Sequence, residues 1–258
     1  ILQQDVVLAD IDQLVKMGAQ HITFGDPDFL NGVKHSLRIV REMRACWPNL
    51  TFDFTAKIEH ILEYQHLMPE FARLGCVFIL SAVECLNDRI LAILDKGHSR
   101  ADVEKALEIT RSAGIPLRPS LLPFTPWATR QDIIELIDFV QTHNLIAHID
   151  PVQYSIRLLL PPGSALLALP ETQPYLYGFD EEKFTFIWKH PDPAMDQLQE
   201  AMATCVEAAA NTGENIYETF VKIRELGYRA SGRRPIPQID YPASARMLPP
   251  RLTEDWFC

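Results

Sequence analysis

The chain has 258 residues, and 47% of them are hydrophobic, so it can bury a substantial core. Its 24 basic and 34 acidic side chains give a formal charge of −10, which argues against a nucleic-acid backbone as a partner. The sequence has neither a signal-peptide pattern nor the run of about 18 apolar residues typical of a membrane span. We therefore expect a cytoplasmic protein without a membrane partner.

The first expected elements are a helix that begins near Asp5 and a strand over residues 22–24. Gly18 lies between them, where a glycine typically ends a helix in the left-handed conformation. Gly75 and Gly114 repeat this arrangement before apolar runs at 77–80 and 115–117.

Two more apolar runs, at 50–54 and 145–149, complete five strand candidates spaced by roughly 25 to 40 residues, the length of one βα unit. Alternation of strand and helix over this length predicts a parallel sheet. The sequence has no glycine-rich phosphate-binding fingerprint, which favours an α/β fold of the partial TIM-barrel type over an open doubly wound sheet. Thr129 and Asp132 have the spacing of a capping box at a helix start.

The pattern changes at Pro161, where a Pro-Pro-Gly run interrupts the alternation. Beyond it we expect a strand over 184–188 and helices over 194–210 and 214–226. The predicted domains are thus a partial βα barrel at 1–160 and a smaller α+β extension with a tail at 161–258.

Both ends of the sequence suggest a fragment. The chain starts on Ile1 and enters a helix with no preceding strand, although a βα barrel begins with one. It ends on Trp256, Phe257 and Cys258, a hydrophobic and reactive ending. We expect the first strand and its loop to be missing.

The most informative segment is His-Ile-Thr-Phe-Gly-Asp-Pro-Asp-Phe-Leu-Asn at 21–31. Gly25 lets the backbone approach a ligand, and Pro27 stiffens the turn and removes a donor. Together with the carboxylates of Asp26 and Asp28, the exposed carbonyls would suit a cationic or amine-bearing ligand. An ordinary loop between a strand and a helix is an equally open interpretation.

Polar residues also follow the other predicted strands, where a barrel carries its chemistry. Each is more often a helix cap or a solvated position. Glu84 is the one we favour, because a carboxylate after an apolar strand needs a partner such as a ligand, Arg118 or Lys57. The full set is Lys57, Glu59, Ser81, Glu84, Arg118, Asp150, Gln153, Tyr154 and Arg157.

The five cysteines are scattered without CxxC spacing, which excludes a local zinc or redox motif. We expect most of them to be small core residues in a reducing compartment.

Several of these motifs resemble the radical SAM superfamily. Gly25-Asp26-Pro27 resembles the Gly-Glu-Pro element after the second strand of those enzymes. Residues 76–105 resemble their fourth strand and helix, with Glu84 in the Gly-x-Glu-Ser turn and Lys96-Gly97-His98 in the Leu-x-x-x-x-Lys-Gly-His segment. The 25–31 run and the last three residues resemble the subgroup with a Cys-Cys/Sec-Ala-Glu-Pro tail. The defining CxxxCxxC loop, which follows the first strand, is absent from the sequence.

The resemblance implies that the intact protein uses S-adenosylmethionine and a 4Fe-4S cluster. It would reductively cleave S-adenosylmethionine to a 5′-deoxyadenosyl radical, which abstracts hydrogen from an unknown substrate, and it would need an electron donor such as flavodoxin or ferredoxin. The fragment would lack the cluster ligands and be inactive. The implied cofactor contacts are backbone oxygens of Gly25, Asp26 and Pro27 for the amino group, Ser81 and Glu84 for the ribose or methionine moiety, and Arg118 for the carboxylate.

Further residues are weaker candidates under the same resemblance. Those that could contact substrate or support the site are Asp28, Lys57, Glu59, Tyr154 and Arg157. Cys258 could ligate an auxiliary metal centre.

Two other classes of function stay open. A cluster-independent βα-barrel lyase or aldolase would use Lys57 as a Schiff-base amine. A non-catalytic binding module would recognise a partner through the part that follows Pro161.

Overall fold

The structure is a computed structural model that describes residues 2–234, 236–237 and 249–250. The predicted tail Trp256, Phe257 and Cys258 lies outside these residues. The described chain forms two compact units. The first contains residues 2–82, 101–119 and 249–250, and the second contains residues 83–100, 120–234 and 236–237.

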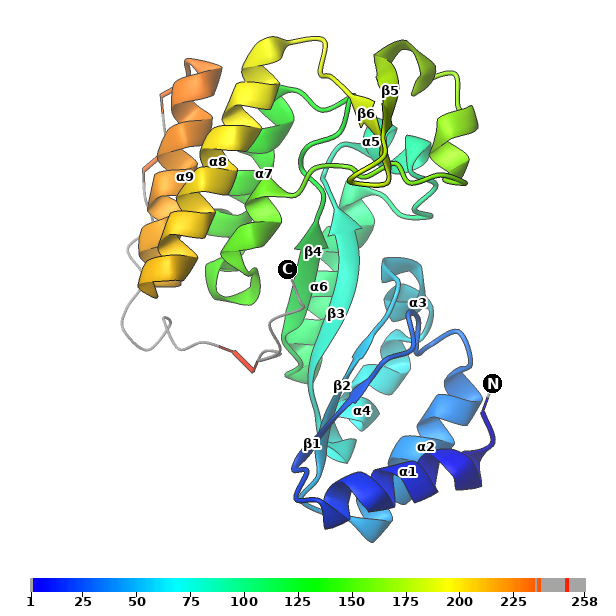
Figure 1. The fold of residues 1–258 in the computed structure, drawn as a ribbon. Helices are drawn as coiled ribbons and strands as arrows, with labels where there is room; N and C mark the ends of the chain where they lie inside the picture. The colour runs from blue at the N-terminus through cyan, green and yellow to red at the C-terminus, as the bar shows by residue number, and fades with distance from the viewer. Residues whose placement is uncertain (1, 235, 238–248, 251–258) are drawn as a thin grey trace. The chain divides into compact units, whose positions relative to one another are not determined.

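Helices and strands alternate as expected up to residue 142, which confirms the α/β class (Figure 1). The described α-helices and strands are α1 (Gln4–Lys16), β1 (His21–Phe24), α2 (Val33–Cys46), β2 (Thr51–Thr55), α3 (Ile58–Glu63), α4 (Met68–Leu74), β3 (Cys76–Glu84), α5 (Asp88–Ile93), α6 (Arg100–Ala113), β4 (Leu117–Leu121), α7 (Arg130–Thr142), β5 (Leu176–Asp180), β6 (Thr185–Trp188), α8 (Pro193–Thr212) and α9 (Ile216–Ser231). Short 3-10 helices lie at η1 (Gln65–Leu67), η2 (Ile146–His148), η3 (Pro151–Ser155), η4 (Ala165–Ala168) and η5 (Gln173–Tyr175).

The first four strands form one sheet in the order β1-β2-β3-β4. β1 pairs with β2 and β2 with β3, both in parallel. Since each parallel neighbour is reached by a helical crossover, this is the predicted part-barrel arrangement.

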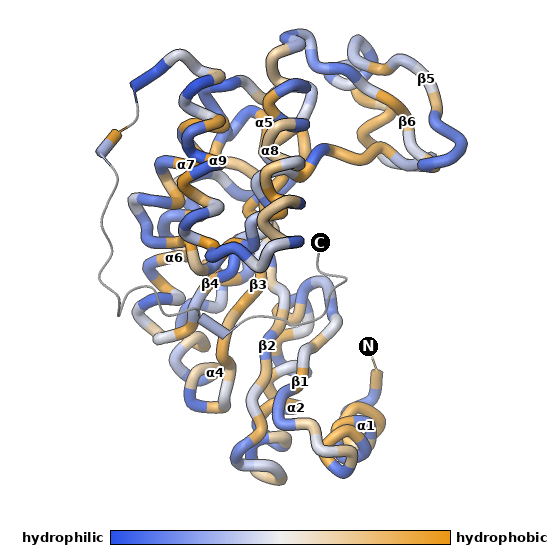
Figure 2. The backbone as a smooth tube through the Cα atoms, turned by 60° about the vertical axis from the view of Figure 1, so that its left-hand side comes forward, coloured by the Kyte–Doolittle hydropathy of each residue, from blue (hydrophilic) through white to orange (hydrophobic). Residues whose placement is uncertain are grey.

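Aromatic packing holds one face of this sheet. Phe29, just after β1, lies 4.7 Å from Phe24 and 4.8 Å from Phe54 between ring centroids. Phe71 of α4 packs against Phe54 at 5.3 Å. Phe52, Phe54 and Phe71 are fully buried. Hydrophobic residues also run along β3, as the colouring in Figure 2 shows. Burial of such rings is a large favourable contribution to folding.

β3 contains an extra residue relative to β2. Phe52 pairs with Cys76, but the next residue, Asp53, pairs with Phe78, so Val77 has no partner on β2. This is a β-bulge, and it shifts the side-chain alternation of β3 by one residue.

The predicted glycine helix ends are confirmed. Gly18, Gly75 and Gly114 have φ angles of +101°, +105° and +76°, a region that other residues rarely adopt. Each follows the last turn of a helix, and the expected strand begins within three residues.

One strand prediction is wrong, and another has shifted bounds. Residues 145–149 are not a strand: the Leu145 amide donates to Val140 O at the end of α7, and 146–148 form η2, which packs against α9. Residues 115–117 are mostly a helix end, since the Ile115 amide donates to Thr110 O, and β4 begins at Leu117. In both places helix-terminating bonds use the start of an apolar run that periodicity alone cannot distinguish from a strand.

The second unit contains the packed helices α7, α8 and α9 and the antiparallel hairpin of β5 and β6. The Thr129–Asp132 capping box is present at the start of α7. The predicted strand and two helices after residue 161 are confirmed, with longer helices than expected. The domain boundary at residue 160 stays a prediction. None of the described helices is both long and apolar enough to cross a bilayer.

We predict that Gly75→Ala lowers the free energy of unfolding by about 1–3 kcal/mol, the typical cost of a strained backbone. A Cβ at this position would also lie 3.1 Å from the Leu50 carbonyl oxygen. Gly114→Ala is the matched control, because a Cβ there meets nothing within 4 Å, so only the backbone term applies. Urea denaturation of both variants measures the difference, and an equal loss at both positions would contradict the steric argument.

Candidate functional site

The turn Gly25-Asp26-Pro27 follows directly on β1, as predicted. All three residues are exposed, whereas Asp28 and Phe29 are buried. The Asp28 amide donates to Asp26 Oδ1 at 2.9 Å, so the Asp26 carboxylate closes the turn on itself. The Phe29 amide then donates to Thr55 O at the end of β2. These bonds fix the turn at the carboxyl edge of the sheet.

The carbonyl oxygens of Gly25, Asp26 and Pro27 accept no hydrogen bond from any other residue in the described ranges. Water or a ligand must therefore satisfy them. Pro27 has no amide hydrogen, so the turn presents acceptors and a carboxylate more than donors. An ammonium group, which carries three donors and no acceptor, is the complementary ligand.

Lys57 and Glu59, which follow β2, pair with each other at 3.2 Å between Nζ and Oε1. The Lys57 side chain is 58% exposed. A Schiff-base lysine is activated by a desolvated pocket or a neighbouring cation. Lys57 is instead exposed and pairs with an anion.

Ser81 and Arg118 lie on β3 and β4 and are both buried. The Ser81 hydroxyl donates to the Ala56 carbonyl at 2.7 Å, a bond that ties β3 to the end of β2. The Arg118 guanidinium lies 5.8 Å from the Phe78 ring centroid and donates to Pro250 O at 3.5 Å. Both side chains thus have intramolecular roles in the first unit.

Glu84 ends β3 in an unusual backbone conformation. Its φ angle is +64°, and the Cys85 amide donates to Val83 O at 2.8 Å across it, which is the hydrogen bond of a γ-turn. Such a conformation stores strain in a residue with a Cβ, and strain of this kind concentrates at functional sites.

The partner of the Glu84 carboxylate is Lys96, whose Nζ lies 2.9 Å from Oε1. The expected need for a partner is therefore met within the second unit, by neither Arg118 nor Lys57. His98 brackets the same segment, with Nδ1 3.2 Å from Lys96 O and Nε2 3.4 Å from Val83 O. From the sequence, Lys96 could be named only as part of the Lys-Gly-His family motif. Arg89 and Arg73 both lie closer to Glu84 in sequence, so no local signal marks Lys96 as its partner.

Tyr154 is buried, and its hydroxyl has no hydrogen-bond partner among the described residues. Burial, and then the nearby Asp150 carboxylate, raise the pKa of Tyr154 well above its ordinary value. Gln153 accepts a hydrogen bond from the Leu121 amide.

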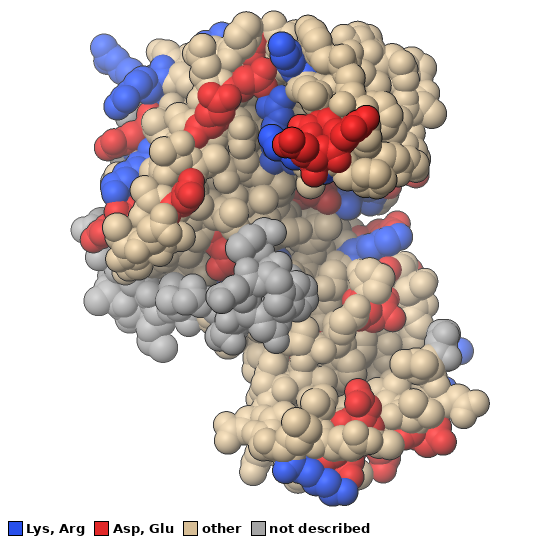
Figure 3. Space-filling view, in the orientation of Figure 1, with Lys and Arg blue, Asp and Glu red and all other residues tan. Residues whose placement is uncertain are grey.

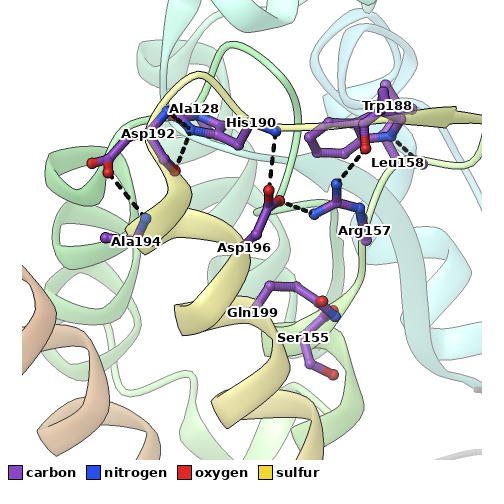
Figure 4. A network of polar contacts seen from close by, with 10 residues as sticks. All are labelled: Ala128, Ser155, Arg157, Leu158, Trp188, His190, Asp192, Ala194, Asp196 and Gln199. Carbon is purple, nitrogen blue, oxygen red and sulfur yellow. Dashed lines mark hydrogen bonds and ion pairs between the residues drawn. The ribbon is translucent and has the colours of Figure 1, made fainter. Parts of the chain in front are cut away.

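Arg157 joins three segments of the second unit (Figure 4). Its Nη1 lies 2.6 Å from Asp196 Oδ1, Nη2 donates to Trp188 O at 2.8 Å, and the guanidinium lies 3.5 Å from the Trp188 ring centroid. Asp196 Oδ2 in turn accepts from the His190 amide. These contacts attach the segment after η3 to β6 and α8.

The cysteines in the described ranges do not form a metal site. Cys76 and Cys85 are buried, Cys46 is exposed, and no group of three His, Cys, Asp or Glu side chains in those ranges could hold a metal. Burial raises the pKa of Cys85 to about 12 and raises that of Cys76 further, so both stay protonated at neutral pH. A thiolate-ligated cluster does not fit these residues.

Charged side chains of both signs are mixed over the face in Figure 3. The absence of a nucleic-acid partner stays a prediction from the net charge of −10.

We predict that Glu84→Gly is more stable than Glu84→Ala by about 1 kcal/mol, because both lose the Lys96 pair but only glycine relieves the positive φ. Glu200, inside α8 of the same unit, is the control: there alanine should be the more stable replacement, by a similar amount. Chemical denaturation compares the four variants. Greater stability of alanine at both positions would exclude strain at Glu84.

A family model and several solved structures match this chain. The family model described as Radical SAM superfamily matches residues 1–140, more than half of the chain. No curated protein matches the sequence. A structure of the cobalamin-dependent S-adenosylmethionine radical enzyme OxsB with aqua-cobalamin bound aligns with a TM-score of 0.69 at 14% identity, covering 88% of this chain and 42% of that one.

A second solved structure is the radical S-adenosylmethionine methyltransferase TsrM from Kitasatospora setae, with cobalamin and a [4Fe-4S] cluster bound. It aligns with a TM-score of 0.53 at 13% identity, over 89% of this chain and 55% of that one. The chain therefore spans about half the length of these structures or less, and at such identities the likeness concerns the fold. Together with the family match, these findings establish that the chain belongs to the radical SAM superfamily.

Proposed function

We propose that the intact protein is a radical SAM enzyme that reductively cleaves S-adenosylmethionine and uses the 5′-deoxyadenosyl radical to abstract hydrogen from its substrate. The observation that carries this proposal is the Gly25–Pro27 turn of a superfamily member, whose exposed carbonyl oxygens have no partner among the described residues. S-adenosylmethionine supplies the amino group that such a turn suits and the 5′-carbon that becomes the radical.

The residues of this chain would bind and orient S-adenosylmethionine. The carbonyl oxygens of Gly25, Asp26 and Pro27 would accept the three ammonium hydrogens, and the Asp26 carboxylate would add its negative charge. The closed turn needs little rearrangement to do so, which lowers the entropic cost of binding. The Glu84 carboxylate would accept a hydrogen bond from a ribose hydroxyl, through the lone pairs that its pair with Lys96 leaves free.

We further propose that the cluster-ligating cysteines lie outside these 258 residues. The lack of a three-ligand group in the described ranges supports this, as does the short coverage of the solved structures. The subgroup with a Cys-Cys/Sec-Ala-Glu-Pro tail, and an auxiliary metal role for Cys258, rest on the sequence alone. An electron donor such as flavodoxin or ferredoxin would reduce the cluster. We also propose a cytoplasmic location, and both proposals rest on the sequence alone.

The aldolase alternative receives less support, because Lys57 is exposed and paired with Glu59. The binding-module alternative has no described feature in its favour over the enzyme.

A second candidate is a cobalamin-dependent form of the same chemistry. Both solved structures named above are described as cobalamin-dependent or cobalamin-bound, and each alignment covers almost nine-tenths of this chain, more than the 160 residues of the predicted barrel.

We predict that anaerobic reconstitution of residues 1–258 gives no stoichiometric 4Fe-4S cluster by iron and sulfide analysis. The intact protein should bind four irons and form 5′-deoxyadenosine from S-adenosylmethionine with dithionite. A stoichiometric cluster in residues 1–258 would contradict the placement of the ligands. A fully reconstituted intact protein that forms no 5′-deoxyadenosine would contradict the function.

For the cobalamin candidate we expect the intact protein to retain about one aqua-cobalamin per chain in equilibrium dialysis, with a shifted visible spectrum. Retention of none would remove this candidate and leave the radical SAM proposal untouched.

A further inference from the structure

Asp28 lies directly behind the ligand-facing turn and has two partners from another part of the first unit. Its carboxylate is buried, with 8% of the residue exposed. Oδ1 accepts from the Lys57 amide at 3.4 Å, and Oδ2 lies 2.7 Å from His60 Nδ1. Since a buried carboxylate is costly without partners, these contacts determine where Asp28 can lie.

The His60 ring in turn has Asp28 as the acceptor near its buried nitrogen. It lies in α3, and its buried Nδ1 has no partner with hydrogen-bond geometry in the described ranges. Asp28 Oδ2 is the acceptor within ion-pair distance of that nitrogen. At this distance a protonated ring makes an ion pair with Asp28, and a neutral ring with its proton on Nδ1 has Asp28 Oδ2 as its nearby acceptor.

The position of Asp28 directly affects the shape of the turn. The Asp28 amide is the donor that closes the turn on Asp26 Oδ1. No described residue donates to the carbonyl oxygens of the turn, so the bond to the Asp26 carboxylate and the rigidity of Pro27 set its shape. On the far side, the Ser36 hydroxyl donates to Phe29 O at 2.6 Å and holds the exit of the loop on α2.

We infer that Asp28 and His60 form a clamp that holds the Gly25–Pro27 turn in the shape that receives the ammonium group of S-adenosylmethionine. The inference rests on the proposed function, since it assigns positioning residues to the same site. Neither residue contacts the ligand: Asp28 acts through the turn, and His60 acts through Asp28.

The test compares two ligands by isothermal titration calorimetry on residues 1–258. S-adenosylmethionine carries the ammonium group, whereas 5′-methylthioadenosine retains the adenosine and lacks the amino-acid part. Asp28→Ala or His60→Gln removes the clamp and should lower the affinity for S-adenosylmethionine about tenfold. This is the typical effect of disturbing one hydrogen bond to a charged group. Binding of 5′-methylthioadenosine should stay the same.

The double variant distinguishes loss of the clamp from general destabilisation of the protein. Because His60 acts through Asp28, adding His60→Gln to Asp28→Ala should cause no further loss of affinity. Asp12→Asn and His66→Gln are the controls, since these side chains lie on the exposed parts of α1 and η1 in the same unit. Melting temperatures of all variants verify that they fold.

The outcomes separate the two ideas. If unchanged residues 1–258 bind both ligands equally, the turn is no ammonium site, and both the proposed function of the turn and the clamp fail. If the unchanged chain prefers S-adenosylmethionine and folded His60→Gln keeps the full preference, the clamp alone is overturned. Equal weakening of both ligands by His60→Gln also overturns it, because the effect would then be general.

Discussion

The insertion of Phe29 into the aromatic layer is the contact on which the rest of the first unit depends. The ring packs against Phe24 and Phe54, and its amide donates to Thr55 O, so one residue joins the loop after β1 to the body of the sheet. Because Phe29 is drawn inward, the three residues before Asp28 are left on the surface. Burial of one hydrophobic side chain thereby fixes the exposed position of the neighbouring polar turn.

Much of the fold was predictable because local chemistry and tertiary structure agree. Glycine in the left-handed conformation after an amphipathic segment predicted three helix ends, and the Thr129–Asp132 spacing predicted the start of α7. The run at 145–149 was not predictable by the same reasoning. It is apolar because it packs against α9, and a buried run of five residues has the same composition in a strand and in a 3-10 turn.

The candidate site also has some features that the sequence could predict and others that it could not. The Gly-Asp-Pro turn after β1 could be predicted because glycine, aspartate and proline are the residue types that favour a tight turn. Its role in binding a ligand stays a proposal. The partners of Asp28 and Glu84 could not be predicted, since His60 and Lys96 are fixed by tertiary placement and not by a local pattern. Ser81 and Arg118 have intramolecular contacts that the sequence did not predict: the hydroxyl donates to Ala56 O and the guanidinium packs on Phe78. Their expected contacts with a ligand stay predictions.

The bulge at Val77 changes the face of the sheet to which each later side chain of β3 belongs. Burial along the strand alternates until Phe78 and Ile79, two consecutive buried residues, and then resumes in the opposite phase. Every later side chain is assigned to its face by that one unpaired residue: Ile79, Ser81 and Val83 point to the buried face, and Glu84 to the other. A natural relative that lacked this residue would have to exchange its polar and apolar positions up to the end of the strand, so insertions and deletions near 77 should be inherited together with compensating changes at 79–84.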